Sequence, residues 1–274
     1  MFISRRITFI VVAVVVAVAF GFFAHYQNNR LVVNRIEVAS DRADSFSIVQ
    51  LSDLHGKQFD ENNYRLLAEV EALSPDLIVT TGDMIDESTA NPEQIASFMG
   101  QLVHIAPTVA VMGNHERRSS LRDDFAQALL GEGVQLLDNQ FLTLQLGASQ
   151  VTLLGFDEND FNREMTRTHE PLLEDLAQRQ NFRIVLTHYP HEYSLTDAPF
   201  NRFDFDLMFS GHAHGGQWVL PGIGALIAPD QGLFPRYTRG LYDGRLVVSP
   251  GLGNSLLPLR LFNYPEIVYL RVNP

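Results

Sequence analysis

The chain has 274 residues, 46% of them hydrophobic and 19% charged, which is typical of a folded protein with one large domain or two small ones. It contains no cysteine, which excludes a disulfide scaffold, a thiol nucleophile, an iron–sulfur cluster and a zinc–thiolate site. Residues 36–274 carry 16 basic and 32 acidic side chains, because residues 1–35 contain four of the 20 basic residues and no acid. This acidic body argues against a nucleic-acid partner and suits the binding of cations.

An uncharged apolar run extends from Ile7 to Ala24, directly after Arg5 and Arg6. As a helix it would be about 27 Å long, close to the thickness of about 30 Å of a bilayer core. The run is apolar on all sides and terminal, which is unlike a helix of a soluble core. We therefore expect a single-pass membrane anchor and a short polar linker (residues 27–30) within residues 1–30, followed by one globular domain over residues 31–274.

Two alternatives to an uncleaved anchor stay open at this stage. Ala17-Val18-Ala19 is an acceptable signal-peptidase site, and the arginine pair resembles a twin-arginine export signal. We favour the anchor, because Phe20 and two further phenylalanines follow the small residues directly. Arginines flank the run on both sides, so the side of the membrane on which the domain lies is also open.

The rest of the chain begins as a regular alternation of strands and helices. Apolar spacing predicts a helix over residues 64–73, ended by Pro75. Asn91 and Pro92 resemble the N-cap and first residue of a second helix, and Ser120 resembles the cap of a third. Strands are expected at residues 46–51, 77–81, 108–112, 142–146, 151–155, 182–186, 206–209, 245–249 and 267–272.

This order, β-α-β-α-β followed by strand-rich sequence, predicts an α/β fold in which two mixed sheets form a sandwich flanked by helices. Residues 147–150 are expected to form the turn of a hairpin. Glycine and proline concentrate over residues 215–258, which we expect to be long loops over one end of the fold.

Five of these strands are followed by loops that contain Asp, Asn or His. Such loops converge at one end of a sheet, so residues far apart in sequence can build one site. Carboxylates and imidazoles without thiolate suit manganese, iron or zinc, and their number suits two ions that share a carboxylate. The candidate residues are Asp53, His55, Asp83, Asn114, His115, His188, His212 and His214.

The order Asp-x-His, Gly-Asp, Gly-Asn-His-Glu, a lone His after a strand and Gly-His-x-His resembles the calcineurin-like metallophosphoesterases over about residues 45–260. The resemblance implies a four-layer sandwich in which residues 31–274 form the catalytic domain. It also implies that two divalent metal ions activate a hydroxide that attacks a phosphoester. We favour manganese among manganese, iron, zinc and magnesium.

The resemblance assigns a role to each candidate by its position. One ion would be held by Asp53, His55 and His214, the other by Asn114, His188 and His212, with Asp83 bridging both. His115 would stabilise the phosphoryl transition state or protonate the leaving oxygen, and Asp86 would pair with His115 and orient its ring.

Protein phosphatases of this superfamily carry Asp-Arg-Gly after the second motif and an arginine before the third. Here these places read Asp86-Glu87-Ser88 and Val111-Met112, which argues against protein dephosphorylation. Arg117 and Arg118 follow the third motif, and their role is open between a phosphate contact and a solvated helix start.

The C-terminal third resembles the bacterial membrane-anchored subgroup, on Gly215-Gly216-Gln217, Gly240-Leu241-Tyr242 and the run from Ser249 to Pro258. This resemblance implies a phosphodiesterase in the cytoplasmic (inner) membrane, with a small-molecule or lipid-linked phosphoester as substrate and no obligate protein partner. Two substrate classes stay open. One is a lipid-linked pyrophosphate such as UDP-2,3-diacylglucosamine of lipid A synthesis, and the other is a different, exported phosphodiester.

Two further questions stay open. Leu226, Ile227, Leu233 and Phe234 would either contact acyl chains or lipid, or pack as a loop on their own core. The alternative to an enzyme is a catalytically inactive, membrane-tethered metal-binding scaffold. No expected metal ligand is replaced in this chain, which argues against the scaffold.

Overall fold

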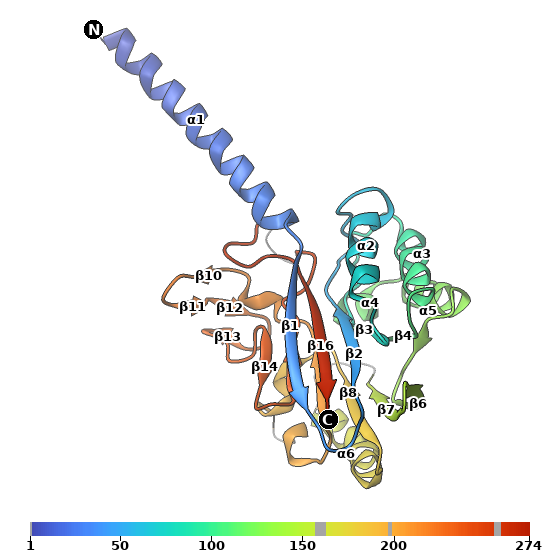
Figure 1. The fold of residues 1–274 in the computed structure, drawn as a ribbon. Coiled ribbons are helices and arrows are strands. Elements are labelled where there is room, and N and C mark those ends of the chain that lie inside the picture. The colour runs from blue at the N-terminus through green and yellow to red at the C-terminus, as the bar shows by residue number, and fades with distance from the viewer. Residues whose placement is uncertain (1, 157–162, 197–198, 255–258) are drawn as a thin grey trace.

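A long helix projects from an α/β domain in the computed structural model (Figure 1), which describes residues 2–156, 163–196, 199–254 and 259–274. Pro258, the end of one motif noted above, lies outside the described residues. The long helix, α1 (Phe2–Asn29), contains a segment from Ile7 to Asn29 that is long and apolar enough to cross a membrane.

The first sheet joins the start and the end of the domain. Its strand order is β1-β16-β2-β3-β4-β5. The strands are β1 (Val32–Ala39), β16 (Glu266–Asn273), β2 (Phe46–Leu51), β3 (Leu77–Thr81), β4 (Thr108–Val111) and β5 (Gln135–Leu136). All neighbours are parallel except β16 and β2, so the sheet is mixed. The C-terminal ends of β2, β3 and β4 consequently lie at one edge.

The second sheet has the order β14-β15-β9-β8-β7-β6. Its strands are β14 (Gly240–Tyr242), β15 (Leu246–Val248), β9 (Leu207–Ser210), β8 (Phe182–Leu186), β7 (Ser149–Gly155) and β6 (Gln140–Leu146). The four central strands are parallel, and hairpins add an antiparallel strand at each edge. The hairpin expected around residues 147–150 is β6–β7.

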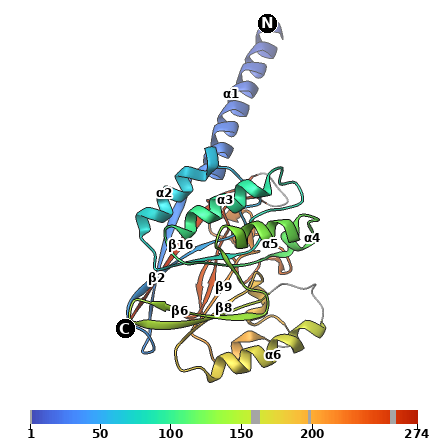
Figure 2. The same ribbon diagram turned by 90° about the vertical axis from the view of Figure 1, so that its right-hand side faces the viewer.

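Helices cover the outer faces of the two sheets and complete four layers (Figure 2). The first sheet is covered by α2 (Tyr64–Leu73), α3 (Pro92–Val103), α4 (Asn114–Arg118) and α5 (Arg122–Gly131), and the second by α6 (Arg163–Gln178). One apolar cluster lies between the sheets, and two others pack the helices onto them. This arrangement confirms the expected four-layer α/β sandwich. Each sheet packs against the other sheet on its inner face and against helices on its outer face, so both of its faces are covered.

Short elements lie in the connections. Among the described residues, four 3-10 turns span Glu61–Asn63, Pro190–Tyr193, Phe200–Arg202 and His214–Gly216. Residues 219–233 form two small hairpins, β10 (Val219–Leu220) with β11 (Gly224–Ala225) and β12 (Ile227–Ala228) with β13 (Gly232–Leu233). These hairpins occupy a region in which we expected only loops.

Two local expectations are wrong. Ser120 does not cap the third helix, because α5 begins at Arg122 and the hydroxyl of Ser119 accepts the N–H of Leu121 instead. Residues 27–29, expected as part of a short polar linker, continue α1 instead. The Gln27 side chain is buried, and its oxygen accepts the backbone N–H of Phe262. The cap at Asn91 is confirmed by its contact with the N–H of Gln94.

Candidate metal centre

Loops from both sheets meet where β2, β3, β4, β8 and β9 end. The backbone N–H of Asp53, after β2, donates to the carbonyl of Gly82, after β3, at 3.0 Å. The carboxylate of Asp53 accepts the N–H of His212, after β9, at 3.0 Å. Asp53 therefore connects the first sheet to the second, and this connection brings the five motifs to one place.

The backbone at this site is held in an uncommon conformation. Positive φ angles between 45° and 64° occur at Asp53, His55, Asp83, His212 and His214. Residues other than glycine adopt this region at a cost, and such strain gathers at functional sites. Gly82 also has a positive φ, of 85°, and a Cβ there would collide with the backbone of Gly113, so the loops approach closely only with glycine.

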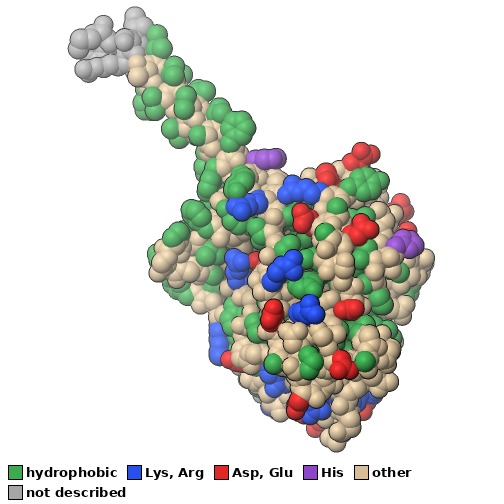
Figure 3. Space-filling view, in the orientation of Figure 1, with side chains coloured by type: hydrophobic (Ala, Val, Ile, Leu, Met, Phe, Trp, Pro, Cys, Tyr) green, Lys and Arg blue, Asp and Glu red, His purple; other side chains and the backbone are tan. Residues whose placement is uncertain are grey.

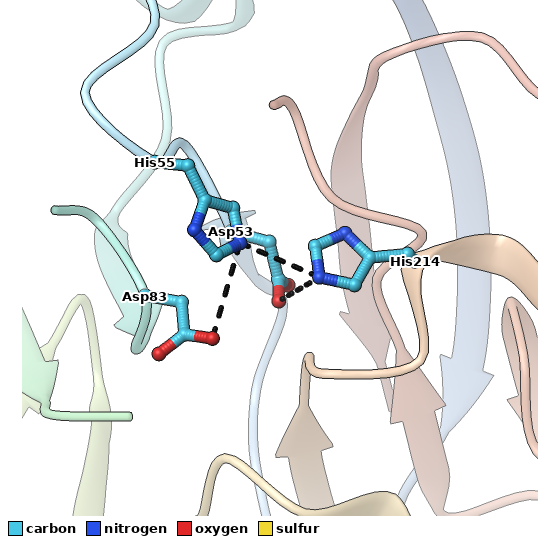
Figure 4. A group of neighbouring side chains, drawn as sticks. All are labelled: Asp53, His55, Asp83 and His214. Atoms are coloured by element: carbon cyan, nitrogen blue, oxygen red, sulfur yellow. Dashed lines mark hydrogen bonds and ion pairs between the residues drawn. The ribbon is translucent and has the colours of Figure 1, made fainter. Parts of the chain in front are cut away.

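One group of possible ligands consists of Asp53, His55, Asp83 and His214, whose donor atoms all lie within 4.8 Å of one another. Figure 4 shows the four side chains converging from three loops. Nε2 of His55 lies 3.4 Å from Nε2 of His214 and 3.9 Å from Oδ2 of Asp83. Nε2 of His214 lies 3.6 Å from Oδ1 of Asp53.

A second group shares Asp83 and adds His188 and His212. Oδ2 of Asp83 lies 3.1 Å from Nε2 of His188, and Oδ1 accepts the N–H of His115 at 2.8 Å. Asn114, which precedes His115, is the first residue of α4. Its Oδ1 is buried and accepts no hydrogen bond from the described residues. A buried carbonyl oxygen without a donor is suited to a cation.

The tautomers of His188 and His212 test whether this group fits a metal. Nδ1–H of His188 donates to the carbonyl of Thr81 at 2.7 Å, and Nε2–H of His212 donates to Asp230 at 2.7 Å. The remaining nitrogens, Nε2 of His188 and Nδ1 of His212, lie 3.1 Å apart and face each other. A shared proton or a metal ion would satisfy this pair, and two imidazole nitrogens beside the Asp83 carboxylate are donors that fit a divalent metal.

The charges around His188 favour a cation at this place, either a proton on the ring or a metal ion. Burial opposes its protonation, but the Asp83 carboxylate outweighs burial and raises the pKa of His188 to about 10. Burial also opposes ionisation of Asp83, yet the surrounding histidines hold the pKa of Asp83 far below its usual range. The centre is therefore built around a permanent carboxylate that stabilises positive charge on its neighbours.

The seven expected ligands thus lie together, and His115 lies beside them. Its ring is half-buried and meets the ring of His55 edge-on at 4.8 Å. Asp86 is not placed as expected. Its carboxylate lies 3.5 Å from Nδ1 of His55, and the described residues show no hydrogen bond or ion pair between Asp86 and His115. Residues 86–89 form a tight turn in which the backbone N–H of Ser88 and the hydroxyl of Thr89 donate to Oδ1 of Asp86. This turn directs the Asp86 carboxylate toward His55.

Two supporting residues were missed in the sequence. Glu116 is buried, and its carboxylate accepts the backbone N–H groups of Asp83, Gly113 and Ile85 at 2.8–3.0 Å, which fixes the second and third motif loops together. Burial and the nearby Asp83 carboxylate raise the pKa of Glu116 to about 7. The sequence signal that could have identified Glu116 is its position as the last residue of the Gly-Asn-His-Glu motif.

Asp230, the second missed residue, lies in the turn between β12 and β13, where no sequence signal identifies it. Its hydrogen bond to His212 lowers the pKa of the Asp230 carboxyl, and the charge of Arg118 lowers it further. Arg118 is exposed and Arg117 half-buried on α4. The role of Arg118, a phosphate contact or a solvated helix start, stays a prediction.

We expect Asp230→Ala to weaken binding of the ion held by His212, because loss of a carboxylate behind a metal-bound histidine typically lowers affinity about 10- to 100-fold. Metal titration of the metal-free chain measures this change. Asp175→Ala, which removes an exposed carboxylate on α6, is the control and should leave both affinities unchanged. Equal affinities in Asp230→Ala and the native chain would contradict this role.

Comparisons with known proteins agree with the geometry. The chain is 30% identical over 285 residues to a protein of Escherichia coli named phosphodiesterase YaeI, covering 98% of this chain and 99% of that one. It is 31% identical over 233 residues to the uncharacterized metallophosphoesterase YkuE of Bacillus subtilis, covering 82% and 78%. A zebrafish transmembrane protein with a metallophosphoesterase domain is 24% identical over 245 residues, covering 85% and 54%.

A family model also matches the chain. The model of calcineurin-like phosphoesterases aligns with residues 46–216, from the start of β2 to the loop after His214. This range contains both groups of possible ligands, whose arrangement fits a dinuclear divalent-metal site. The chain therefore belongs to the calcineurin-like phosphoesterase family and is a metal-dependent phosphoester hydrolase.

Proposed function

We propose that this protein is a membrane-anchored phosphodiesterase whose two metal ions hydrolyse a phosphodiester or pyrophosphate bond of a lipid-linked substrate. The observation that carries the proposal is the position of the dinuclear site next to the end of α1. Lys57, two residues after His55, donates from Nζ to the carbonyls of Asn28, at the end of the helix, and Leu252. The loop that carries His55 therefore lies against the end of the membrane-spanning helix, which supports a substrate held in the membrane.

The proposed ligands are those of the two groups. Asp53, His55 and His214 would hold one ion, Asn114, His188 and His212 would hold the other, and Asp83 would be shared by both. When bound, the ions supply a hydroxide near neutral pH and polarise the phosphoryl oxygens. Manganese is the proposed native metal, because oxygen and imidazole ligands without thiolate suit it.

We propose that His115 stabilises the phosphoryl transition state or protonates the leaving oxygen. Its ring lies half-buried beside His55, and its backbone N–H donates to Asp83. Asp86 is the proposed partner of His55, where it orients the ring through Nδ1.

We place the protein in the cytoplasmic membrane as a single-pass protein with α1 uncleaved. The unbroken helix from Phe2 to Asn29 and its docking on the catalytic domain support an anchor. Relatives named as a phosphodiesterase and as a transmembrane protein are consistent with this. A substrate with acyl chains gains from such an anchor, because tethering raises the local concentration of enzyme at the lipid.

The test is hydrolysis by the full chain in lipid nanodiscs with manganese. We expect cleavage of both a chromogenic aryl diester and UDP-2,3-diacylglucosamine, with a higher kcat/KM for the lipid nucleotide, and loss of both activities in EDTA. Cleavage of the aryl diester alone would support phosphodiesterase activity but exclude the lipid nucleotide as substrate. The physiological substrate would then be a different, exported diester. Two bound metal ions without any turnover would identify an inactive scaffold.

A further inference from the structure

The last turns of α1 are fixed to the catalytic domain. The ring of Phe23 meets the ring of Phe262 edge-on at 6.1 Å, and Oε1 of Gln27 accepts the N–H of Phe262 at 3.0 Å. Oδ1 of Asn28 accepts the N–H of Arg260 at 2.9 Å. The domain is therefore held at a defined height and angle relative to the helix.

This docking gives the height of the domain relative to a membrane. The apolar run of α1 ends at Ala24, which lies at the boundary of the hydrocarbon when the helix spans a bilayer. Phe262, in contact with Phe23, lies at the same level and is half exposed. Residues bonded to this segment are consequently close to the lipid headgroups.

Two hairpins are bonded to this segment. We call residues 219–234, which contain β10 to β13, the apolar lobe. Val219 donates its N–H to the carbonyl of Leu261 at 2.9 Å, and Nε1 of Trp218 donates to Leu259 at 3.0 Å. Figure 1 shows the apolar lobe on the left, beside the end of α1.

The apolar lobe exposes large apolar side chains. The exposed fractions are 62% for Ile223, 49% for Ile227, 71% for Leu233 and 67% for Phe234. Figure 3 shows hydrophobic side chains over the protrusion beneath α1, while acidic side chains lie over the other parts of this face. Exposed apolar residues are normally scattered, and a cluster of them marks a surface that contacts lipid or protein.

The charge around the apolar lobe favours lipid as the partner. Residues 215–242 contain Arg236 and Arg239 and a single acidic residue, Asp230, whereas residues 36–274 together carry 16 basic and 32 acidic side chains. Both arginines are exposed, and Arg239 also forms an ion pair with Glu266. Basic residues that flank an apolar surface are attracted to anionic lipid headgroups.

We propose that the apolar lobe is a membrane-contact surface that inserts Ile223, Ile227, Leu233 and Phe234 into the interfacial region of the bilayer that α1 crosses. Interfacial segments of this kind lie about 5–10 Å deep at the boundary of headgroups and acyl chains. The turn of β12–β13 also carries Asp230, which bonds His212. Membrane contact thus positions the metal centre next to the lipid surface, whichever phosphoester is the substrate.

The absence of cysteine in the chain makes the test direct. Ile223→Cys and Leu233→Cys each carry a single environment-sensitive fluorophore in the full chain, reconstituted in nanodiscs of phosphatidylcholine and phosphatidylglycerol. The matched control is Leu130→Cys on α5, which is 57% exposed, far from the apolar lobe. We expect lipids with a nitroxide on the upper acyl chain to quench most of the emission at 223 and 233 and little at 130.

Equal, weak quenching at all three positions, with full access to iodide in water, would overturn the proposal. Shielding of 223 and 233 from both quenchers would also overturn it, because another protein surface would then cover the apolar lobe. Trp218, the single tryptophan, offers a readout without substitution. Its emission in the native chain should fall with the nitroxide lipids, and an unchanged emission would contradict insertion. None of these results depends on catalysis.

Discussion

Asp83→Asn is expected to abolish phosphodiester hydrolysis, with a loss of about a thousand-fold or more in kcat/KM, the scale of removing an essential electrostatic group. Asp83 is the residue shared by both ligand groups, and it is fully buried among His55, His188 and the N–H of His115. Asparagine keeps the shape of the side chain but removes the negative charge. We expect fewer than two metal ions per chain, measured by elemental analysis alongside the kinetics.

A suitable control for this variant is Asp124→Asn, which makes the same chemical change at an exposed position on the first turn of α5. Its activity and metal content should equal those of the native chain. Full turnover in Asp83→Asn would refute the dinuclear mechanism, because no other described carboxylate belongs to both ligand groups.

His115→Ala is expected to lower kcat by about 10²- to 10⁴-fold, the usual contribution of a general acid, while two metal ions remain bound. His115 belongs to neither ligand group, although its ring packs against that of His55. A substrate with a good leaving group, such as an aryl diester, should suffer less than an alkyl diester, because it depends less on protonation. Kinetics on the two diesters, together with metal analysis, measure this.

The control for the histidine is His104→Ala, since His104 is exposed after the end of α3, outside both ligand groups. It should leave both kinetic constants unchanged. Loss of both ions in His115→Ala would show that His115 is itself a metal ligand. Equal losses on aryl and alkyl diesters would exclude proton donation as the role of His115. Its role would then be to stabilise the transition state.

Much of the fold could be predicted because local pattern and tertiary structure agree there. The buried strands β2, β3 and β8 have the expected bounds, since continuous apolar runs between turn residues leave little ambiguity. The cap of α3 at Asn91 follows from local chemistry in the same way. The helix cap predicted at Ser120 was wrong because two adjacent serines can accept a backbone N–H at this helix start. The hydroxyl of Ser119 is the one that accepts the N–H of Leu121.

The ligand groups could be anticipated because their residues follow strands directly, and strand ends converge by geometry alone. Asp230 could not, because its partner His212 is 18 residues away and the turn that carries it has no chemical signature. The orientation of Asp86 toward His55 also could not be predicted. It depends on the hydrogen bonds that Ser88 and Thr89 donate to the Asp86 carboxylate within the turn of residues 86–89.

The sequence by itself determined the apolar helix, the strand order along the chain and the identity of the metal-binding motifs, because each depends on residue type and short-range spacing. Tertiary structure alone decided how α1 meets the domain, that the apolar lobe stays exposed beside it, and which carboxylate supports which histidine. These features rest on contacts such as that of Gln27 with Phe262, more than 200 residues apart, whose formation depends on the packing of the whole domain.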